Sequence, residues 1–335
     1  MKAQGVIWPA LGTVDIEEFE VADPGPGQVR IETEWSQVSP GTEHSWLMGI
    51  DPIPPMFKAP DGSDFPQRPG YSIAGRVAAV GPDANGFREG DPVVAIARHA
   101  TQATLDADEV IRVPERVDLE SAAFFHLGFV ALNGVRRARI ELGEPVAVMG
   151  LGVVGLLSLQ AARLQGGLPV VALDLVESRL ELARRCGADL TVDVRDSDAL
   201  EALADSLEGG PAVVIEATAA LAPIRTALQL VRQQGRVVLV TSRFGEISLN
   251  VLGGIHLKGT EVIGAHTLAR PRHDSRPGSW TWRDDAATFL NLLRYGRLDV
   301  KPLITHRVPG EKAASLYELV KTADPSLIGG LLHWR

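Results

Sequence analysis

A glycine-rich turn between an apolar strand and a helix constrains the fold more than any other feature of this 335-residue sequence. The strand is expected at 145–150, and the helix continues through 156–165. The turn between them reads Gly150-Leu151-Gly152-Val153-Val154-Gly155. In such a turn the first glycine permits the tight bend, the second lets the backbone approach a pyrophosphate, and the third lets the helix pack closely on the strand. The free N–H groups of the helix start then bind the phosphates. The pattern predicts a dinucleotide-binding unit.

An acidic residue at the end of the next strand points to the type of dinucleotide. Asp174 ends the strand expected at 168–174, 24 residues after Gly150. A carboxylate there accepts hydrogen bonds from the adenosine ribose and repels a 2′-phosphate, which favours NAD(H) over NADP(H). Arg179 follows five residues later, beside the adenine or within reach of a phosphate, and leaves NADP(H) open. Further cofactor contacts are expected where two later strands end, at Ala217, Thr218, Thr241 and Ser242.

Strands and helices alternate between residues 119 and 263, which is typical of a Rossmann unit, a doubly wound α/β fold with a parallel sheet. The strands are expected at 145–150, 168–174, 191–194, 212–218, 236–242 and 260–265. The helices between them are expected at 156–165, 178–187, 197–207 and 221–233. A turn without a ligand is the alternative interpretation of the glycines, and the strand, the spacing and the acid together argue against it.

The flanking regions have a different pattern. The first 120 residues contain short β-rich runs between Pro/Gly turns, which predicts a compact β domain. After residue 265 comes a loop rich in Arg, Pro and Trp, followed by two amphipathic helices at 284–296 and 311–322. We therefore expect three segments, 1–120, 121–265 and 266–335, the last returning to the first domain.

Composition excludes several classes of protein. The formal net charge of −9 argues against nucleic acid as a partner. Cys186 is the only cysteine, which rules out an intramolecular disulfide and a site of clustered thiolates. The first twenty residues lack the apolar core of a signal peptide, and no run approaches the ~20 apolar residues of a membrane span. A cytoplasmic protein without membrane contact is expected.

Several segments together resemble the medium-chain dehydrogenase/reductase superfamily, the fold of alcohol dehydrogenases. The matching pieces are 39–43 (SPGTE), 68–81, 87–95, 121–135 and the glycine-rich turn. The resemblance spans nearly the whole chain and implies a split GroES-like β domain around a Rossmann domain, with a catalytic cleft between the two. It also implies a homodimer or homotetramer built through the Rossmann sheet, with 260–266 as the edge strand.

The departures from that family concern zinc. Where zinc alcohol dehydrogenases carry Cys-Gly-Thr-Asp, this chain reads Pro40-Gly41-Thr42-Glu43, and their Gly-His-Glu reads Gly70-Tyr71-Ser72. The third ligand position corresponds to His126. One possible ligand cannot hold a catalytic zinc, which takes three protein ligands. The four-cysteine structural zinc loop is also missing. The resemblance therefore narrows to the zinc-independent branch, with no metal expected.

Without zinc, side chains must stabilise the developing alkoxide. The resemblance offers Thr42 as the hydroxyl of a proton relay, Tyr71 as a donor to the carbonyl oxygen, His126 as an acid or base, and His44 as an extension of the relay. Each also has a structural interpretation: a turn residue for Thr42, a core tyrosine, a buried histidine, and a solvated or packing role for His44. Glu43 would orient His44 or cap local backbone.

The loop at 266–285 combines arginines with Trp280 and Trp282, a pairing common at binding surfaces. It is either a lid that meets a polar or anionic substrate, or a dimer-contact or surface loop. With SPGTE and PGY it looks similar to a branch of the superfamily that includes the bacteriochlorophyll-pathway hydroxyethyl dehydrogenase. Its arginines are Arg270, Arg272, Arg276 and Arg283.

Three functions follow from these features. The first is an NAD(H)-dependent, zinc-independent alcohol dehydrogenase or ketone reductase acting on a small polar substrate such as a sugar, cyclitol or ring derivative. The second is an NADPH-dependent quinone or enone reductase of the same superfamily, against which Asp174 argues. The third is a non-catalytic dinucleotide-binding protein.

Overall fold

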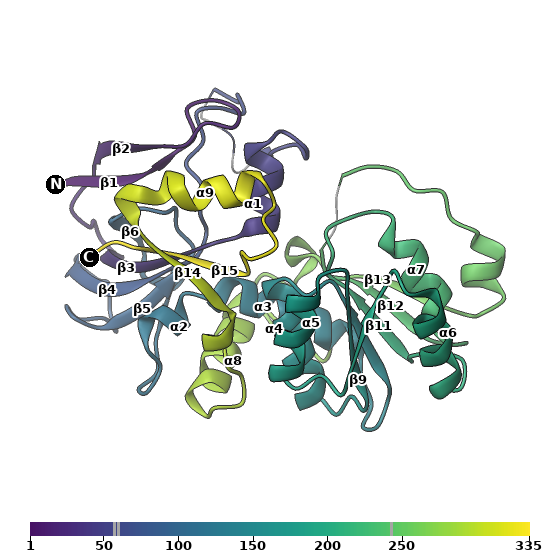
Figure 1. The fold of residues 1–335 in the computed structure, drawn as a ribbon. Coiled ribbons are helices and arrows are strands. Elements are labelled where there is room, and N and C mark those ends of the chain that lie inside the picture. Colours follow the sequence, from purple (N-terminus) through teal and green to yellow (C-terminus); the bar gives the residue numbers. More distant parts are fainter. Residues whose placement is uncertain (56–57, 59–60, 242–243) are drawn as a thin grey trace. The chain divides into compact units, whose positions relative to one another are not determined.

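The computed structural model describes residues 1–55, 58, 61–241 and 244–335. The chain forms two compact units (Figure 1). Unit 1 comprises residues 1–126, 290–294 and 304–335, and unit 2 comprises 127–289 and 295–303. The loop at 266–283 therefore belongs to unit 2. The three segment boundaries expected from the sequence remain predictions.

Unit 1 is a β domain, as the Pro/Gly-punctuated N-terminal sequence predicts. Its seven-stranded sheet has the order β14-β15-β3-β4-β5-β7, with β6 paired to β3, and β1 pairs with β2 in a separate ladder. The strands are β1 (Lys2–Ile7), β2 (Asp15–Glu20), β3 (Gln28–Val38), β4 (Ile73–Val80), β5 (Pro92–Ala95), β6 (Gln102–Asp106), β7 (Val110–Arg112), β14 (Ile304–Pro309) and β15 (Gly329–His333). The C-terminal strands β14 and β15 thus complete a sheet begun near the N-terminus.

Helices and two apolar clusters hold unit 1 together. One cluster is formed by side chains that the sheet strands carry, including Ile31 of β3, Ile73 of β4 and Val93 of β5. The other joins Trp8 of the N-terminal segment to α1 and α9 through Leu47 and Tyr317. The helical elements are α1 (Pro40–Leu47), η2 (Ala107–Glu109), α2 (Leu119–Ala122), η6 (Gly310–Lys312) and α9 (Ala313–Lys321).

Unit 2 is a Rossmann domain, which confirms the fold class predicted from the alternating pattern. Its six strands are all parallel in the order β10-β9-β8-β11-β12-β13. In chain order this is 3-2-1-4-5-6, the doubly wound arrangement. The strands are β8 (Val146–Met149), β9 (Val170–Asp174), β10 (Leu190–Asp193), β11 (Val213–Glu216), β12 (Arg236–Leu239) and β13 (Glu261–Gly264).

The helices of unit 2 follow the predicted positions within a few residues. They are α4 (Val153–Leu164), α5 (Glu177–Arg185), α6 (Ser197–Ser206), α7 (Pro223–Leu230), η3 (Leu252–His256), η4 (Thr267–Ala269) and η5 (Lys301–Leu303). Gly187, with φ +96°, follows the end of α5, as its glycine stop predicts. Two helices, α3 (Phe125–Ala138) and α8 (Trp282–Arg294), contain residues of both units. No helix in the described residues is long and apolar enough to span a membrane.

Candidate functional site

The glycine-rich turn of unit 2 joins the end of β8 to the start of α4, and each glycine is there for a different steric reason. Gly150 has φ +89°, a conformation that favours glycine. A Cβ at Gly155 would lie 1.8 Å from the carbonyl oxygen of Gly150, so no side chain fits there. A Cβ at Gly152 would meet no atom within 4 Å. The turn therefore leaves open space where a pyrophosphate would approach the backbone, and it fits a dinucleotide.

Asp174 at the end of β9 is bound to this turn. It is 8% exposed, and its Oδ2 accepts a hydrogen bond of 2.6 Å from the N–H of Leu151. Its Oδ1 accepts from the N–H groups of Leu175 and Val176, at 2.7 and 3.0 Å. The three hydrogen bonds fix the turn. The two carboxylate oxygens together have about four lone-pair directions, so one remains to accept a hydrogen bond from a ligand. Arg179 lies in the first turns of α5, partly buried.

The next strand ends supply the other expected cofactor contacts. Ala217 and Thr218 follow β11, where the N–H of Thr218 donates to Glu216 Oε1 at 2.8 Å and its hydroxyl donates to the same oxygen. The hydroxyl of Thr241 accepts from the N–H of Ala219 at 2.9 Å, which ties the end of β12 to that of β11. Ser242 lies outside the described residues.

Glu216 itself is fully buried. Burial raises the pKa of its carboxyl, and the two hydrogen bonds from Thr218 oppose that rise. Its second oxygen, Oε2, has no hydrogen-bond partner among the described residues. The sequence analysis missed this residue. The signal available was an acid in an otherwise apolar strand.

Unit 1 brings together three of the four expected catalytic residues. Tyr71 is 6% exposed, and its ring lies 4.4 Å from that of His126, centroid to centroid. Burial is the main cause that raises the pKa of the Tyr71 phenol, followed by the charge of Glu43, while hydrogen bonds with Ser39 and Thr42 act in the opposite direction. Thr42 and His126 are partly exposed. The cluster is a buried, protonated phenol between a hydroxyl and an imidazole.

His44 does not belong to this cluster. Its Nδ1 lies 2.7 Å from the carbonyl oxygen of Val320, so the ring links α1 to α9. Of the two roles open to Glu43, orienting His44 or capping local backbone, the structure shows the second. Glu43 Oε1 accepts from the N–H of Ser39 at 2.8 Å and lies 3.3 Å from His99 Nε2. Adjacent positions on one short helix turn in different directions, so sequence proximity was a poor guide here.

The residues at the family's zinc positions are a poor set of zinc ligands. Pro40 has no ligating atom, Tyr71 offers a phenol that stays protonated, and only His126 has a ligand of the type zinc prefers. Within the described part of the chain, no three His, Cys, Asp or Glu side chains come together to hold a metal ion. This set of donor atoms does not fit zinc.

The arginine-rich loop is held by contacts within unit 2. Arg270 Nη1 and Arg136 Nε bind the two oxygens of Asp285, at 3.0 and 2.6 Å, and the Arg270 side chain also donates to the carbonyl of Phe129. The guanidinium of Arg136 lies 3.5 Å from the centre of the Trp280 ring. Arg270 and Trp280 thus have packing roles, whereas Arg272 and Arg276 are exposed.

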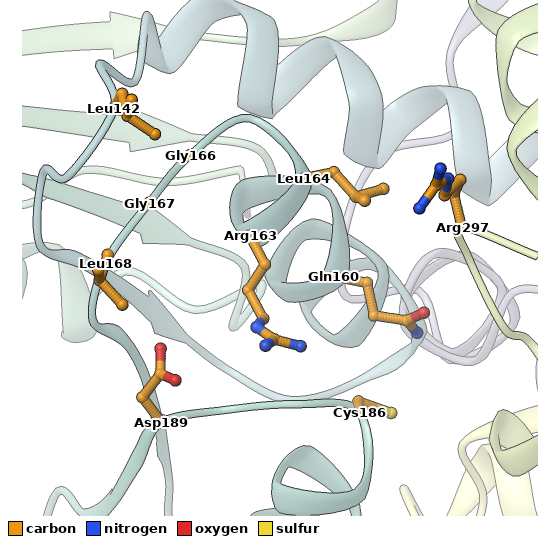
Figure 2. A pocket seen from close by; sticks show the side chains of 10 residues that line it. All are labelled: Leu142, Gln160, Arg163, Leu164, Gly166, Gly167, Leu168, Cys186, Asp189 and Arg297. Atoms are coloured by element: carbon orange, nitrogen blue, oxygen red, sulfur yellow. The ribbon is translucent and has the colours of Figure 1, made fainter.

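A separate cavity of about 440 Å³ lies in unit 2 (Figure 2). Its lining comes from segments that precede β8, β9 and β10, at the opposite end of the strands from the glycine-rich turn. The side chains of Gln160 and Arg163 reach it from α4, and Cys186 lies after α5. Burial raises the pKa of the Cys186 thiol to about 11, so it is protonated at neutral pH. None of the site residues expected from the sequence lines this cavity.

Comparison with known proteins agrees with both units. The alcohol dehydrogenase GroES-like domain matches residues 25–121, and the zinc-binding dehydrogenase domain matches residues 153–281. The two matches support kinship with the medium-chain dehydrogenase/reductase superfamily. The fold consists of a GroES-like β domain and a Rossmann domain.

Individual relatives match most of the chain. It is 24% identical to (R,R)-butanediol dehydrogenase of Bacillus subtilis (strain 168), with 90% of this chain and 91% of that protein covered. It is 26% identical to human sorbitol dehydrogenase, with 92% and 90% covered. The solved structure of 2R,3R-butanediol dehydrogenase from B. subtilis has the same fold, with a TM-score of 0.85, 21% identity and 99% and 100% of the two chains covered. Among other structures with this fold, one contains NADP and another NADH.

Two residues of the unit 1 cluster escaped the sequence analysis. His99, in the segment that follows β5, is completely buried beside Glu43. Tyr317 of α9 donates its hydroxyl proton to Glu43 Oε2 from 274 residues away in the sequence. The helical pattern at 311–322 predicted that α9 would have a buried face but not which residue that face would meet.

Proposed function

We propose that this protein is an NAD(H)-dependent alcohol dehydrogenase or ketone reductase that acts without zinc on a polar secondary alcohol or carbonyl. The observation that carries the proposal is the glycine-rich turn, whose three glycines have the conformation, close packing and open space that a pyrophosphate requires. The names of the relatives, butanediol and sorbitol dehydrogenase, support alcohol and polyol chemistry.

The cofactor would be held by the backbone N–H groups at the start of α4 and by the ends of the parallel strands. NAD, when bound, accepts or supplies a hydride at C4 of its nicotinamide ring. Asp174 would accept a hydrogen bond from the adenosine ribose with its remaining lone pair, while its bonds to Leu151, Leu175 and Val176 keep it in place. A 2′-phosphate would meet this carboxylate, which favours NAD(H).

The proton would be handled by the unit 1 cluster. In the reducing direction Tyr71 donates its phenolic proton to the carbonyl oxygen as the hydride reaches the carbon, and the product is the alcohol. The pKa of this phenol is raised, so it carries its proton at neutral pH. Thr42 and His126, which are partly exposed, would return a proton from solvent to the phenolate.

We also propose that the reaction proceeds without zinc, and the residue types at Pro40 and Tyr71 support this. We further propose a small polar substrate such as a sugar, cyclitol or ring derivative, with no nucleic acid or membrane partner. The kinship with the bacteriochlorophyll-pathway branch, a cytoplasmic location and a homodimer or homotetramer are also proposals. The exposed edge strand β13 supports self-association through the Rossmann sheet.

Binding and turnover measurements test this function. NADH and NADPH are titrated against the purified protein, and a panel of vicinal diols, polyols and hydroxyketones is assayed with NAD⁺ or NADH. We expect tighter binding of NADH, turnover of at least one alcohol, and unchanged turnover after dialysis against a zinc chelator. A clear NADPH preference with reduction of quinones or enones would establish the enone reductase instead. NADH binding without turnover of any substrate would make the protein a non-catalytic dinucleotide binder, and loss of activity on chelation would refute zinc independence.

A further inference from the structure

We propose that Glu43 and His99 form a buried pair that positions the hydroxyl groups of Tyr71 and Thr42 for proton transfer. This inference rests on the proposed function, because it assigns a role relative to the Tyr71 proton. It concerns two residues that touch neither substrate nor cofactor in the mechanism above, and it is argued entirely from contacts within unit 1.

Glu43 is the centre of the pair. Its side chain is 1% exposed and both of its oxygens are bound. Oε1 accepts from the N–H of Ser39 at 2.8 Å and from His99, and Oε2 accepts from the hydroxyl of Tyr317. Ser39 in turn is a hydrogen-bond partner of the Tyr71 phenol, and Thr42 directly precedes Glu43 in α1. One carboxylate thus fixes the short segment that carries both partners of Tyr71.

His99 holds the other side, the segment that carries Tyr71 itself. The N–H of His99 donates to the carbonyl of Pro69 at 2.9 Å. A Cβ at Gly70 would lie 2.5 Å from His99 N and 2.7 Å from the ring carbon Cγ, so the chain just before Tyr71 lies directly against His99. Gly70 has φ +104°, which further restricts this position to glycine. His99 therefore connects the Tyr71 segment to Glu43 and α1.

A chain of hydrogen bonds fixes the orientation of the imidazole. Trp334 Nε1 donates to Ser36 Oγ at 2.9 Å, and Ser36 Oγ lies 2.9 Å from His99 Nδ1. Nε2 faces the Glu43 carboxylate, which can only accept, so Nε2 carries the proton. In the neutral imidazole Nδ1 then accepts from the Ser36 hydroxyl. Trp334 and Ser36 on β3 thereby hold the ring with Nε2 toward the carboxylate.

The burial of this pair points to a role beyond packing. Burial of a carboxylate opposes folding unless the carboxylate is fully hydrogen-bonded. Replacing a buried ionic pair by apolar residues of similar volume often leaves the folding stability unchanged or increases it. The ionisable groups that face Tyr71 are Glu43 on α1, Tyr317 on α9 and His126 at the start of α3. Of these, Glu43 is the one whose negative charge raises the Tyr71 pKa. The charge of Glu43 thus adds to the effect of burial on the Tyr71 pKa, while its hydrogen bonds hold the segment that carries the partners of the phenol.

The first test follows the ionisation of Tyr71 directly and needs no substrate. The chain has three tyrosines, so in a Tyr295→Phe, Tyr317→Phe background the tyrosinate absorbance near 295 nm comes from Tyr71 alone. Adding Glu43→Gln to this background should move the ionisation of Tyr71 to lower pH. Asp91→Asn is the matched control, because it neutralises another largely buried carboxylate of unit 1 and should leave the ionisation where it was. An unchanged ionisation in the Glu43→Gln protein would overturn the proposal.

The second test separates positioning from packing. In the otherwise native chain, His99→Gln keeps a nitrogen that can donate to Glu43, whereas His99→Leu does not. We expect kcat to fall by roughly ten- to a hundredfold in His99→Leu and Glu43→Gln, as is typical when a residue that orients a reacting group is lost, and His99→Gln to recover part of it. KM and NADH binding should change little. Equal losses in both His99 variants, in proportion to their thermal stability, would make the role structural.

The two levels of the proposal fail in different ways. If the wild-type protein turns over no alcohol or ketone, the proposed function is lost, and the tyrosine absorbance still decides whether Glu43 controls Tyr71. If the wild type is active but Glu43→Gln and His99→Leu retain full kcat with an unshifted Tyr71, the pair has no positioning role and the function stands.

Discussion

The imidazole of His126 packs against the phenol ring of Tyr71, with centroids 4.4 Å apart and an interplanar angle of 48°. The ring of Trp46 lies on the same tyrosine at 6.5 Å, close to edge-on. Aromatic contacts of this kind restrict the tyrosine ring beyond what burial alone achieves. Side chains at two of the family's zinc positions are therefore in direct contact with each other, and the proposed proton transfer involves both rings.

The hydroxyl of Tyr71 can be removed without removing the ring. In Tyr71→Phe the packing against His126 and Trp46 remains, so thermal stability and NADH binding should stay near wild type. We expect kcat to fall by roughly 10²- to 10⁴-fold, the usual contribution of a positioned acid or base. Steady-state kinetics and a fluorescence titration with NADH measure the two effects. Wild-type kcat in this variant would remove Tyr71 from the mechanism.

His126 can be tested for its nitrogen and its ring separately. His126→Phe keeps an aromatic ring against Tyr71 but cannot carry a proton, whereas His126→Ala loses both. If the imidazole returns protons to Tyr71, both variants should lose at least tenfold in kcat, with the phenylalanine protein closer to wild type in thermal stability. An active His126→Phe beside an inactive His126→Ala would show instead that His126 only supports the tyrosine ring.

The glycine-rich turn makes a prediction that separates binding from folding. Gly152→Ala places a methyl group in open space, so the free energy of unfolding should change by less than about 1 kcal/mol. The same methyl group occupies the approach of the pyrophosphate, and the Kd for NADH should rise at least about tenfold. Gly155→Ala forces a methyl group against the Gly150 carbonyl and should destabilise the fold by about 1–3 kcal/mol as well.

Isothermal titration with NADH and chemical denaturation of both variants check this contrast. NADH binding by Gly152→Ala with wild-type affinity would show that the turn does not hold a pyrophosphate. The exposed Gly86→Ala, in a unit 1 turn at φ +92°, serves as a control for the general effect of a glycine replacement, with no loss of NADH affinity expected.

The local pattern of the sequence sufficed for the Rossmann unit, since its strands, helices and glycine turn are encoded by neighbouring residues. The strands and helices around Gly150 and Asp174 lie within a few residues of their expected positions. The unit 1 cluster was accessible only in part. Tyr71 and His126 were identified through a resemblance to a known family. The side-chain partners of Glu43, by contrast, lie far away in the sequence, on the segment after β5 and on α9. No periodicity encodes a contact between residues 43 and 317.

The orientation of short side chains was the other limit. Glu43 and His44 are neighbours in the sequence, yet one points to His99 and the other to the Val320 carbonyl. Asp174 was expected to meet a ribose, and its bond to the Leu151 N–H adds a structural role. Such roles depend on which backbone N–H and C=O groups lack partners after folding. The residues next to a side chain in the sequence do not determine this.

Glu216 gives a pH-dependent prediction for stability. Its pKa is raised from the ordinary value of 4.5 by burial in the folded protein, so the folded state binds the proton more tightly than the unfolded state. The resulting stabilisation is fully present below the unfolded pKa and is lost as the pH rises through the folded value. In Glu216→Gln the group cannot ionise, and the hydrogen bonds from Thr218 find an amide oxygen instead. The Tm of this variant, relative to wild type, should therefore rise as the pH increases from the ordinary value of 4.5 and level off above the folded pKa of Glu216.

Thermal unfolding of both proteins across pH 4–9 measures this difference. The exposed Glu201→Gln, on α6, is the control and should follow the wild-type curve. A constant offset between Glu216→Gln and wild type at all pH values would mean that Glu216 has the same proton affinity in the folded and unfolded chains. The predicted divergence would instead show that the folded chain retains the Glu216 proton to higher pH than the unfolded chain, and the protonated acid can donate a hydrogen bond that an ionised carboxylate cannot.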